Sequence, residues 1–450
     1  MSILLYNIFL FFFKVGTHVA SLFNSKAKKW VLGRHHIFEN LEKAIPPGEK
    51  IIWIHCASLG EFEQGKPIIE KLKAWGTGHK ILLTFFSPSG YEAQKDYKGA
   101  DWIFYLPVDG PHHAKRFVEI VHPSLVIFVK YEFWYYYLKK IRYRNIPLLL
   151  VSALFRKDMS FFKWYGGLQR KMLARFDHLF VQNETSKKLI DEIGLAHICS
   201  VSGDTRFDRV IEIANQWEPV PAIERFIGNS KAIIAGSTWP EDEEVLQKAF
   251  TSIHESSPKL IIAPHEISEK HMDELEKLFP NSIRYSRIAV GKPLAADGLP
   301  THDADATVSI PTSAIANRRD SRLTTVLIID NIGMLSRLYK YAYITYVGGG
   351  LRTMGVHNVL EAAVYYKPVF FGEHFRKYAE AVQLILTGGG LPFYDEKRNG
   401  IMLAELIEAL LTNKEEYDHR ARVAGDFVLS HKGATQKIIQ FIQENRLLTN

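Results

Sequence analysis

The chain has 450 residues, of which 47% are hydrophobic and 23% charged, and this composition excludes a disordered chain. It has two cysteines, Cys56 and Cys199, which exclude a disulfide framework or a four-cysteine zinc site and favour a reducing compartment. The net charge of +7 suits an anionic partner, although many soluble enzymes are slightly basic for no specific reason; zinc-finger and aromatic–basic RNA-binding patterns are missing, so we expect no nucleic-acid partner.

The N-terminus is apolar and then basic. Residues 1–13 carry no charged side chain, and a basic segment from Lys14 to Arg34 follows. The apolar run is shorter than the roughly 20 residues of a spanning helix, and no signal-peptide cleavage pattern follows it. Two interpretations are open: a monotopic anchor that lies in a membrane interface, or a buried first helix. We favour an anchor over residues 1–24, with an anionic membrane surface as partner, because aromatic side chains crowd this terminus.

Short apolar runs then alternate with helical patterns, which is typical of βαβ units and parallel sheets. A break at Asn215–Pro221, with two prolines, divides the pattern into domains at 25–215 and 222–450. We expect two α/β domains of similar size, with a ligand site in a cleft between them. Expected strands lie at Ile51–His55, Ile81–Phe86, Leu125–Val129, Leu148–Val151, His178–Val181, Ala232–Ala235, Leu260–Ala263, Thr325–Ile329, Tyr343–Val347 and Val369–Phe371.

The C-terminal half also contains irregular and helical stretches. Ala289–Thr312 is rich in Gly, Pro, Ala and Asp without a period, so we expect a loop there. Helices are expected at Leu403–Leu411, Glu415–Leu429 and Ala434–Glu444.

The first motif with catalytic potential is HCASLGE, at residues 55–61, directly after an expected strand. Gly60 allows a tight turn, and Glu61 then begins a helix whose N-terminus stabilises a carboxylate. A functional Glu61 would be a general base, whereas the structural alternative is ordinary capping of a first helical turn.

The second motif combines a glycine run with a polar helix start. Gly348, Gly349 and Gly350 end a strand, and consecutive glycines allow the backbone to approach a phosphate. Asn358 and Glu361 are three residues apart and share one helical face, where they could hold a ribose or a base. The run is neither a Walker A loop nor a G-x-G-x-x-G motif, and a simple glycine-rich turn is the alternative.

Two weaker patterns follow strands in the second half. Ser237 or Thr238 in GSTWPEDEE is suited to cap an acidic helix start. His265-Glu266 with His271 is not an H-E-x-x-H pattern and lacks a third ligand nearby, so we expect no metal site.

Taken in order, these motifs resemble the 3-deoxy-D-manno-octulosonic acid (Kdo) transferases of lipopolysaccharide assembly. The resemblance extends over about residues 50–365 and rests on IWIHCASLGEFEQGKP, SPSG, YLPVDGP, YEFW, SGDTRFD, GSTWPEDE, the stretch Asp330–Tyr339, YVGGGL and GVHNVLEAA. It implies a GT-B fold of two Rossmann-like domains facing a central cleft. It also implies inverting transfer of Kdo from CMP-Kdo to a lipid A precursor (lipid IVA), at the cytoplasmic face of the bacterial inner membrane, without a cofactor.

The resemblance also implies roles for individual residues. Glu61 is the expected catalytic base. The expected donor-binding residues are Arg206, Ser237, Thr238, Pro264, His265, Gly333, Met334, Gly348, Gly349, Gly350, Asn358 and Glu361. The expected acceptor-binding residues are Ser58, Gly60, Glu132 and Arg156, with Arg34 and Lys66 as further candidates for acceptor phosphates. The last helix could pack back on the first domain.

Several positions depart from the family's usual pattern. His265-Glu266 stands where Arg-His is common, and Met334 stands where a Glu is usual. Lys130 replaces a usual Glu, and Trp239 replaces a usual His. These departures leave the class intact and indicate a divergent branch.

Two other functions are compatible with the sequence. One keeps the fold and changes the chemistry, as in a UDP-sugar-dependent transferase or a nucleotide-sugar epimerase. The other is a membrane-associated nucleotide- or lipid-binding protein without catalysis, which predicts that Glu61 can be replaced without loss of function.

Overall fold

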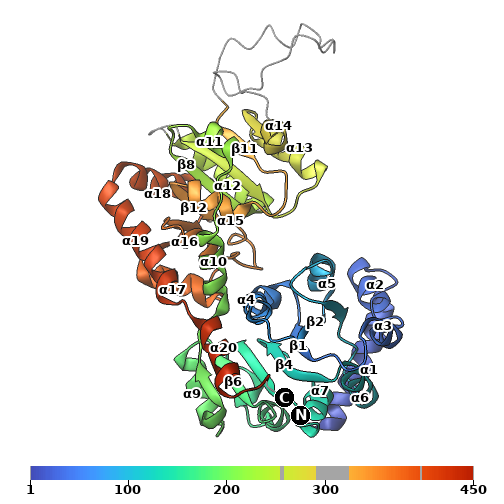
Figure 1. Ribbon diagram of the computed structural model, residues 1–450. Helices are drawn as coiled ribbons and strands as arrows, with labels where there is room; N and C mark the ends of the chain where they lie inside the picture. Colours follow the sequence, from blue (N-terminus) through green and yellow to red (C-terminus); the bar gives the residue numbers. More distant parts are fainter. Residues whose placement is uncertain (1, 254–257, 290–323, 396–397, 449–450) are drawn as a thin grey trace. The chain divides into compact units, whose positions relative to one another are not determined.

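The computed structural model describes residues 2–253, 258–289, 324–395 and 398–448 (Figure 1). The chain forms two compact units, the first from Met1–Arg209 with His431–Asn450 and the second from Val210–Ser430. Each unit contains one seven-stranded sheet, and every strand pairing is parallel. The α/β class with two Rossmann-like sheets is therefore confirmed. The loop expected at Ala289–Thr312 lies outside the described residues from position 290 onward.

The sheet of the first unit has the strand order β3-β2-β1-β4-β5-β6-β7. Its central strands β1 (Ile51–Cys56) and β5 (Leu148–Ala153) are buried along their whole length. Such continuous burial is typical of parallel strands with helices on both faces, and it explains their uninterrupted apolar sequences. The other strands are β2 (Lys80–Phe85), β3 (Trp102–Tyr105), β4 (Pro123–Val129), β6 (His178–Val181) and β7 (Cys199–Val201).

Two hydrophobic clusters form the core of this unit. Successive residues of β1 belong to different clusters, Trp53 to one and Ile54 to the other, because neighbouring side chains of a strand point to opposite faces. The helices of the unit are α1 (Ile3–Ala20), α2 (Ser25–Leu32), α3 (Ile37–Ala44), α4 (Leu59–Trp75), α5 (Pro88–Gln94), α6 (Pro111–Val121), α7 (Tyr135–Tyr143), α8 (Gly167–Leu173), α9 (Glu184–Glu192) and α20 (Ala434–Glu444), with short 3-10 turns at Ser160–Phe162 and Ala196–Ile198.

The last helix returns to the first unit. Ile438 and Ile442 of α20 are fully buried in the same cluster as Ile54. The Asp208 carboxylate accepts hydrogen bonds from the backbone N–H groups of Gly433 and Thr435, at 2.5 and 2.6 Å, and so satisfies the orphan donors at the start of α20.

The first helix, α1, is docked along one narrow stripe. Tyr6 and Leu10 are its buried residues, and the Tyr6 hydroxyl donates to Asp109 Oδ2 at 2.6 Å. Phe9, Phe11 and Phe12 are 53%, 63% and 66% exposed. By length and composition, α1 could cross a membrane, with a mean hydropathy of 1.6 over 18 residues. The helix thus leaves a broad apolar face uncovered. Its length and composition by themselves are weak evidence for anchoring, because core helices and signal sequences share them.

The sheet of the second unit has the order β10-β11-β9-β8-β12-β13-β14. Its strands are β8 (Ala232–Thr238), β9 (Lys259–Pro264), β10 (Ser282–Arg284), β11 (Val326–Ile328), β12 (Ile344–Val347), β13 (Val369–Phe371) and β14 (Gly390–Pro392). Helix α10 (Thr205–Asn215) runs into this unit, whose other helices are α11 (Pro221–Ile227), α12 (Pro240–Ser252), α13 (Glu269–Leu278), α14 (Tyr285–Ala289), α15 (Leu335–Leu338), α16 (Leu360–Ala363), α17 (Ala379–Thr387), α18 (Ile401–Thr412) and α19 (Lys414–Ser430), with a 3-10 turn at Tyr339–Tyr341.

In both sheets the order of the strands along the sheet reverses beside the first strand of the unit. In the first unit the order changes between β1 and β4, and in the second between β8 and β12. Ligands of open α/β sheets bind outside the carboxyl ends of the strands at such a switch point. The loops after these four strands are therefore the first places to look for a site.

Candidate active site

Glu61 lies at the switch point of the first unit, in the first turn of α4 directly after β1. The Ser58 hydroxyl donates a short hydrogen bond to Glu61 Oε2, which fixes the carboxylate. The side chain of Glu61 is 17% exposed, so the group is sheltered but reachable. The helix N-terminus stabilises its negative charge, as expected from the sequence.

Lys130 faces Glu61 across the switch point. It follows β4, and its Nζ lies 4.0 Å from Glu61 Oε1. Its φ of 67° is unusual for a residue with a side chain, and its backbone N–H donates to Val151 O at 2.9 Å. The loop after β4 therefore holds an ammonium group beside the carboxylate. The sequence marked Lys130 only as a departure from the family pattern.

Tyr131 marks where two predicted arginines lie relative to Glu61. Burial raises the pKa of the Tyr131 hydroxyl, while the charges of Arg156 and Arg206 lower it and that of Glu61 raises it. Because all three groups act on one hydroxyl, the first unit brings them together around it. Arg156 is also paired with Asp158, with Nε 3.5 Å from Oδ1.

Arg206 is held by a buried carboxylate. Its Nε and Nη2 donate to Asp204 Oδ2 at 2.9 and 2.7 Å, and Gln64 Nε2 donates to both oxygens of Asp204 at 3.2 Å. Burial raises the pKa of Asp204, but the Arg206 guanidinium outweighs it and leaves that pKa below its usual value. Arg206 belongs to the first unit, whereas every other residue expected at the donor belongs to the second.

Glu132 is part of a buried polar network beneath the same edge of the sheet. Its Oε2 lies 2.9 Å from His55 Nε2 and accepts a hydrogen bond from Trp134 Nε1 at 2.6 Å. His55 Nδ1 lies 2.9 Å from Thr84 Oγ1. Because Glu132 has two protein partners and is 8% exposed, it stabilises the loop after β4 rather than presenting an open acceptor.

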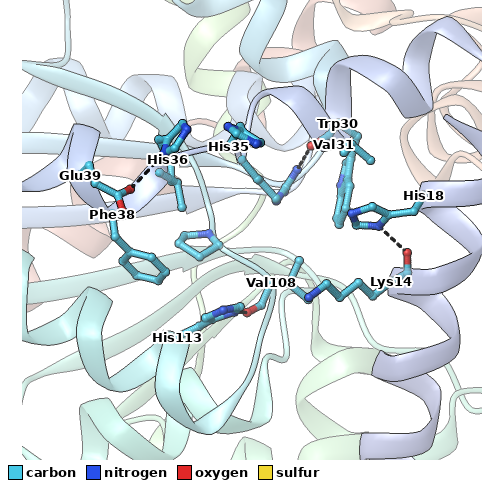
Figure 2. A pocket seen from close by; sticks show the side chains of 13 residues that line it. Lys14, His18, Trp30, Val31, His35, His36, Phe38, Glu39, Val108 and His113 are labelled. Carbon is cyan, nitrogen blue, oxygen red and sulfur yellow. Dashed lines mark hydrogen bonds and ion pairs between the residues drawn. The ribbon is translucent and has the colours of Figure 1, made fainter.

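A basic pocket of about 380 Å³ lies beside α1 in the first unit (Figure 2). Lys14 extends into it from α1, and His113 lines it with Nδ1 2.8 Å from Val108 O. Among the residues that the structure describes, none forms an ion pair with Lys14. The pocket lining also includes His18, His35 and His36, with Glu39 as its acidic member. Such a lining suits an anionic group.

Arg34 also lines this pocket, but its guanidinium is committed to the fold. It donates to the carbonyl oxygens of Leu106, Trp30 and Phe86 at 2.9, 3.0 and 2.8 Å. The rings of Trp30, Phe86 and Tyr105 lie 4.0–5.0 Å from its Cζ. Arg34 therefore ties α2 to the ends of β2 and β3.

In the second unit, the glycine run Gly348–Gly350 follows β12, as expected. A side chain at Gly348 would lie 2.3 Å from Ser237 O, and one at Gly350 would lie 2.5 Å from Gly372 N. The run is therefore needed for close backbone approach. The Gly348 N–H donates to Gly236 O and the Gly349 N–H to Asp242 Oδ2, both at 2.9 Å, so these two amides already have protein partners.

Thr238 and Asp242 link this loop to α12. The Thr238 hydroxyl donates to Glu243 Oε1 at 2.8 Å, and the same oxygen lies 3.2 Å from His271 Nε2. Asp242 accepts the Tyr346 hydroxyl at 2.6 Å in addition to Gly349, and burial raises its pKa. His271 thus has a carboxylate partner in this network. No group of three or more metal-ligating side chains occurs among the described residues.

Asn358 and Glu361 meet, but not on one helical face as predicted, because α16 begins at Leu360 and Asn358 precedes it. Asn358 Nδ2 donates to Glu361 Oε1 at 3.0 Å. Glu361 raises the pKa of Tyr339, whose hydroxyl lies against Gly236 of β8, so this pair is near the switch point. Gly333 has a φ of 94°, and Met334 precedes α15. Leu335 of α15 also lies against Gly236, which brings this segment to the end of β8.

His265 lies at the end of β9 in a stack of rings. Its centroid is 4.6 Å from that of Trp239 and 4.5 Å from that of His357. Trp239 and His357 were not among the predicted site residues, because their contact joins positions 118 residues apart in the chain. The sequence marked Trp239 as a departure from the family pattern, and each of the two residues follows an expected strand.

Residues 32–209 match the family model described as 3-deoxy-D-manno-octulosonic-acid transferase (kdotransferase). Glu61, Lys130 and Arg206 all lie within this match. Over these residues the chain is similar to the Kdo transferase family. A Kdo transferase of Aquifex aeolicus is 28% identical over 368 residues, which are 81% of this chain and 87% of that protein. A bifunctional glycosyltransferase/methyltransferase of Fusobacterium nucleatum is 25% identical over 408 residues, or 89% of this chain, but the match spans only 56% of that protein.

Solved structures agree with the fold described above. A UDP-GlcNAc 2-epimerase from Neisseria meningitidis superposes with a TM-score of 0.58 and 15% identity, over 88% of this chain and all of that one. A glycosyltransferase from Rickettsia africae superposes with a TM-score of 0.54 and 14% identity, over 90% of this chain and all of that one. At these identities the likeness concerns the fold alone, which is GT-B-like.

Proposed function

We propose that this chain transfers Kdo from CMP-Kdo to a lipid A precursor, lipid IVA, with inversion at the anomeric carbon. The observation that carries the proposal is Glu61, a sheltered carboxylate at a helix N-terminus and a sheet switch point, in a chain similar to the Kdo transferases.

In the proposed reaction, Glu61 removes the proton from an acceptor hydroxyl. The hydroxyl oxygen forms a bond to the anomeric carbon of Kdo as the bond from that carbon to the phosphate oxygen breaks. CMP leaves with the electron pair, and the proton stays on Glu61. Ser58 orients the carboxylate through its hydrogen bond. Gly60 lies in the first turn of α4 without a positive φ, so it does not form the predicted glycine turn. The charges of Lys130 and Arg206 suit the anionic reactants.

We assign the donor to the second unit. Asn358 and Glu361 form a polar pair suited to ribose or base hydrogen bonds. Ser237, Pro264, His265, Gly333, Met334 and Gly350 are proposed as its neighbours. Thr238 supports the site indirectly, since its hydroxyl is bonded to Glu243. Gly348 and Gly349 contribute shape rather than free amides.

We assign the acceptor and the membrane to the first unit. The exposed apolar face of α1 suits a lipid surface, and the adjacent basic pocket suits a phosphate of the acceptor or of a headgroup. Lys14 and His113 replace Arg34 as the proposed phosphate ligands, and Arg156 remains a candidate near Glu61. This arrangement fits an enzyme at the cytoplasmic face of a bacterial inner membrane.

The test is transfer of labelled Kdo, from CMP-Kdo generated in the reaction, to lipid IVA. We expect product with the native chain, a loss of at least about 1,000-fold with Glu61→Gln, and near-native rates with Glu63→Gln on the same helix. Equal rates for the native chain and Glu61→Gln would support the transferase activity but contradict the role of Glu61 as the general base. If the native chain gives no product, UDP-sugar donors are tried next, and failure there leaves a binding protein.

A further inference from the structure

Three aromatic side chains stack at the carboxyl ends of three adjacent strands of the second unit. Trp239 follows β8, His265 follows β9, and His357 lies in the loop after β12. The ring centroids of Trp239 and His265 are 4.6 Å apart, and those of His265 and His357 are 4.5 Å apart. The Arg352 guanidinium lies 4.2 Å from the Trp239 ring. The stack therefore occupies the switch point of this sheet.

One hydrogen bond in the stack fixes the chemistry of a histidine. Trp239 Nε1 and His357 Nε2 are 3.0 Å apart. An indole N–H can only donate, so Nε2 of His357 is the acceptor and carries no proton. The single proton of the neutral ring is then on Nδ1. Among the described residues, Nδ1 of His357 has no hydrogen-bond partner.

The surroundings favour this neutral form. Burial, with a contribution from His265, lowers the pKa of His357 to about 4. Burial lowers the pKa of His265 as well, and Arg352 adds to the effect. The cationic form of His357 would lose the acceptor that Trp239 requires, so bond and burial act in the same direction.

The ring of His357 also lies directly against the glycine run. A Cβ atom at Gly349 would be 2.8 Å from His357 Cδ2 and 3.2 Å from Nε2. The Gly348 and Gly349 amides already have acceptors, so the run offers neither amide to an anion. The ring atoms nearest the run are Cδ2 and Nε2, so Nδ1 lies across the ring from the run and is the ring's remaining donor for a ligand.

We propose that Trp239 is a positioning residue that holds His357 as a fixed Nδ1–H donor to a phosphate oxygen of the bound nucleotide. The inference rests on the donor assignment proposed above and adds to it a residue pair and a protonation state. A neutral imidazole donates a hydrogen bond to the phosphate and does not transfer its proton to the departing CMP.

The experiment measures CMP binding by calorimetry with the full chain and four variants. Asn carries its amide nitrogen near the position of histidine Nδ1, and Gln carries it near Nε2. We expect His357→Asn to retain affinity within about threefold and His357→Gln to lose about tenfold, the contribution of one hydrogen bond to a charged group. Trp239→Phe should also lose about tenfold, and Trp164→Phe, at a side chain that is 92% exposed, should bind like the native chain.

Two further readouts separate positioning from a structural effect. In the His357→Asn background, Trp239→Phe should cause no further loss of CMP affinity, because an amide has no tautomer that the indole could fix. In the 15N-histidine-labelled chain, long-range correlations should show an unprotonated Nε2 at His357 that becomes partly protonated in Trp239→Phe. Unchanged CMP affinity in Trp239→Phe and His357→Gln, or an equal loss in the His357→Asn background, would overturn the proposal. A native chain that does not bind CMP would refute the donor assignment itself.

Discussion

Arg34 gives a sharp test of how the first unit is held together. Its guanidinium donates to three backbone carbonyl oxygens, at 2.8–3.0 Å, that belong to α2 and to the residues after β2 and β3. Burial lowers its pKa to about 9, which leaves the group charged at neutral pH. Arg34→Met removes the charge, the hydrogen bonds and the contacts with three aromatic rings together.

The magnitude follows from the geometry. A hydrogen bond from a charged donor contributes about 1.5–3 kcal/mol, and two of the three carbonyls, those of Leu106 and Phe86, lie outside α2, which Arg34 follows. Removing a buried cation returns part of its desolvation cost. We therefore expect Arg34→Met to lower the free energy of unfolding of the first unit by about 2–4 kcal/mol. Arg34→Lys should recover less than half, because an ammonium cannot span three separated acceptors.

Hydrogen exchange of the β1 and β2 amides measures this quantity in detergent, since central strands report the opening of the whole unit. Arg156→Met is the matched control, because the Arg156 side chain is 57% exposed and has one ion pair at 3.5 Å; it should cost less than about 0.5 kcal/mol. If the free energy of unfolding of Arg34→Met, measured by exchange, is within about 0.5 kcal/mol of that of the native chain, Arg34 does not stabilise the first unit as argued. Arg34 is then again a candidate phosphate ligand.

Three other predictions concern the second unit and the basic pocket. Gly348→Ala should destabilise the second unit by about 1–3 kcal/mol in hydrogen exchange of the β8 and β12 amides, because its Cβ would lie 2.3 Å from Ser237 O, whereas Gly110→Ala, with no heavy atom within 4 Å of its Cβ, should leave the exchange of the β1 and β2 amides unchanged. As pH falls from about 6.5 to about 4, the second unit should lose about 1–2 kcal/mol, since His357 takes up a proton more readily unfolded than folded; His357→Asn should flatten that slope. The double variant Lys14→Glu with His113→Gln should bind vesicles of anionic lipid about tenfold more weakly in a sedimentation assay, whereas Lys188→Glu on α9 should bind like the native chain. An equal loss in both variants would show that net charge, not the pocket, determines binding.

The strands that the sequence predicted are the inner strands of both sheets. β1, β5 and β8 consist almost entirely of buried residues, so each appears as an uninterrupted apolar run. The four strands that it missed, β3, β7, β10 and β14, are the edges of the two sheets. An edge strand has a neighbour on one side only and is short, so its sequence is mixed and gives no period.

Part of the candidate site was also determined locally. Glu61 was identified because a strand and a helix start lie within a few residues, and Asn358 and Glu361 were paired by their spacing of three, although Asn358 precedes α16. These features depend on backbone geometry over one or two turns, which the local sequence dictates.

Tertiary structure alone decided which side chains complete these local features. Lys130 reaches Glu61, Trp239 reaches His357, and Arg34 reaches the carbonyls of Phe86 and Leu106. The first two pairs are brought together by the strand order of a parallel sheet, which places the ends of distant strands side by side, and Arg34 reaches the ends of β2 and β3 from the turn after α2. Hydrophobic patterning specifies that such strands exist and face inward, but their neighbours are fixed only when the whole core packs.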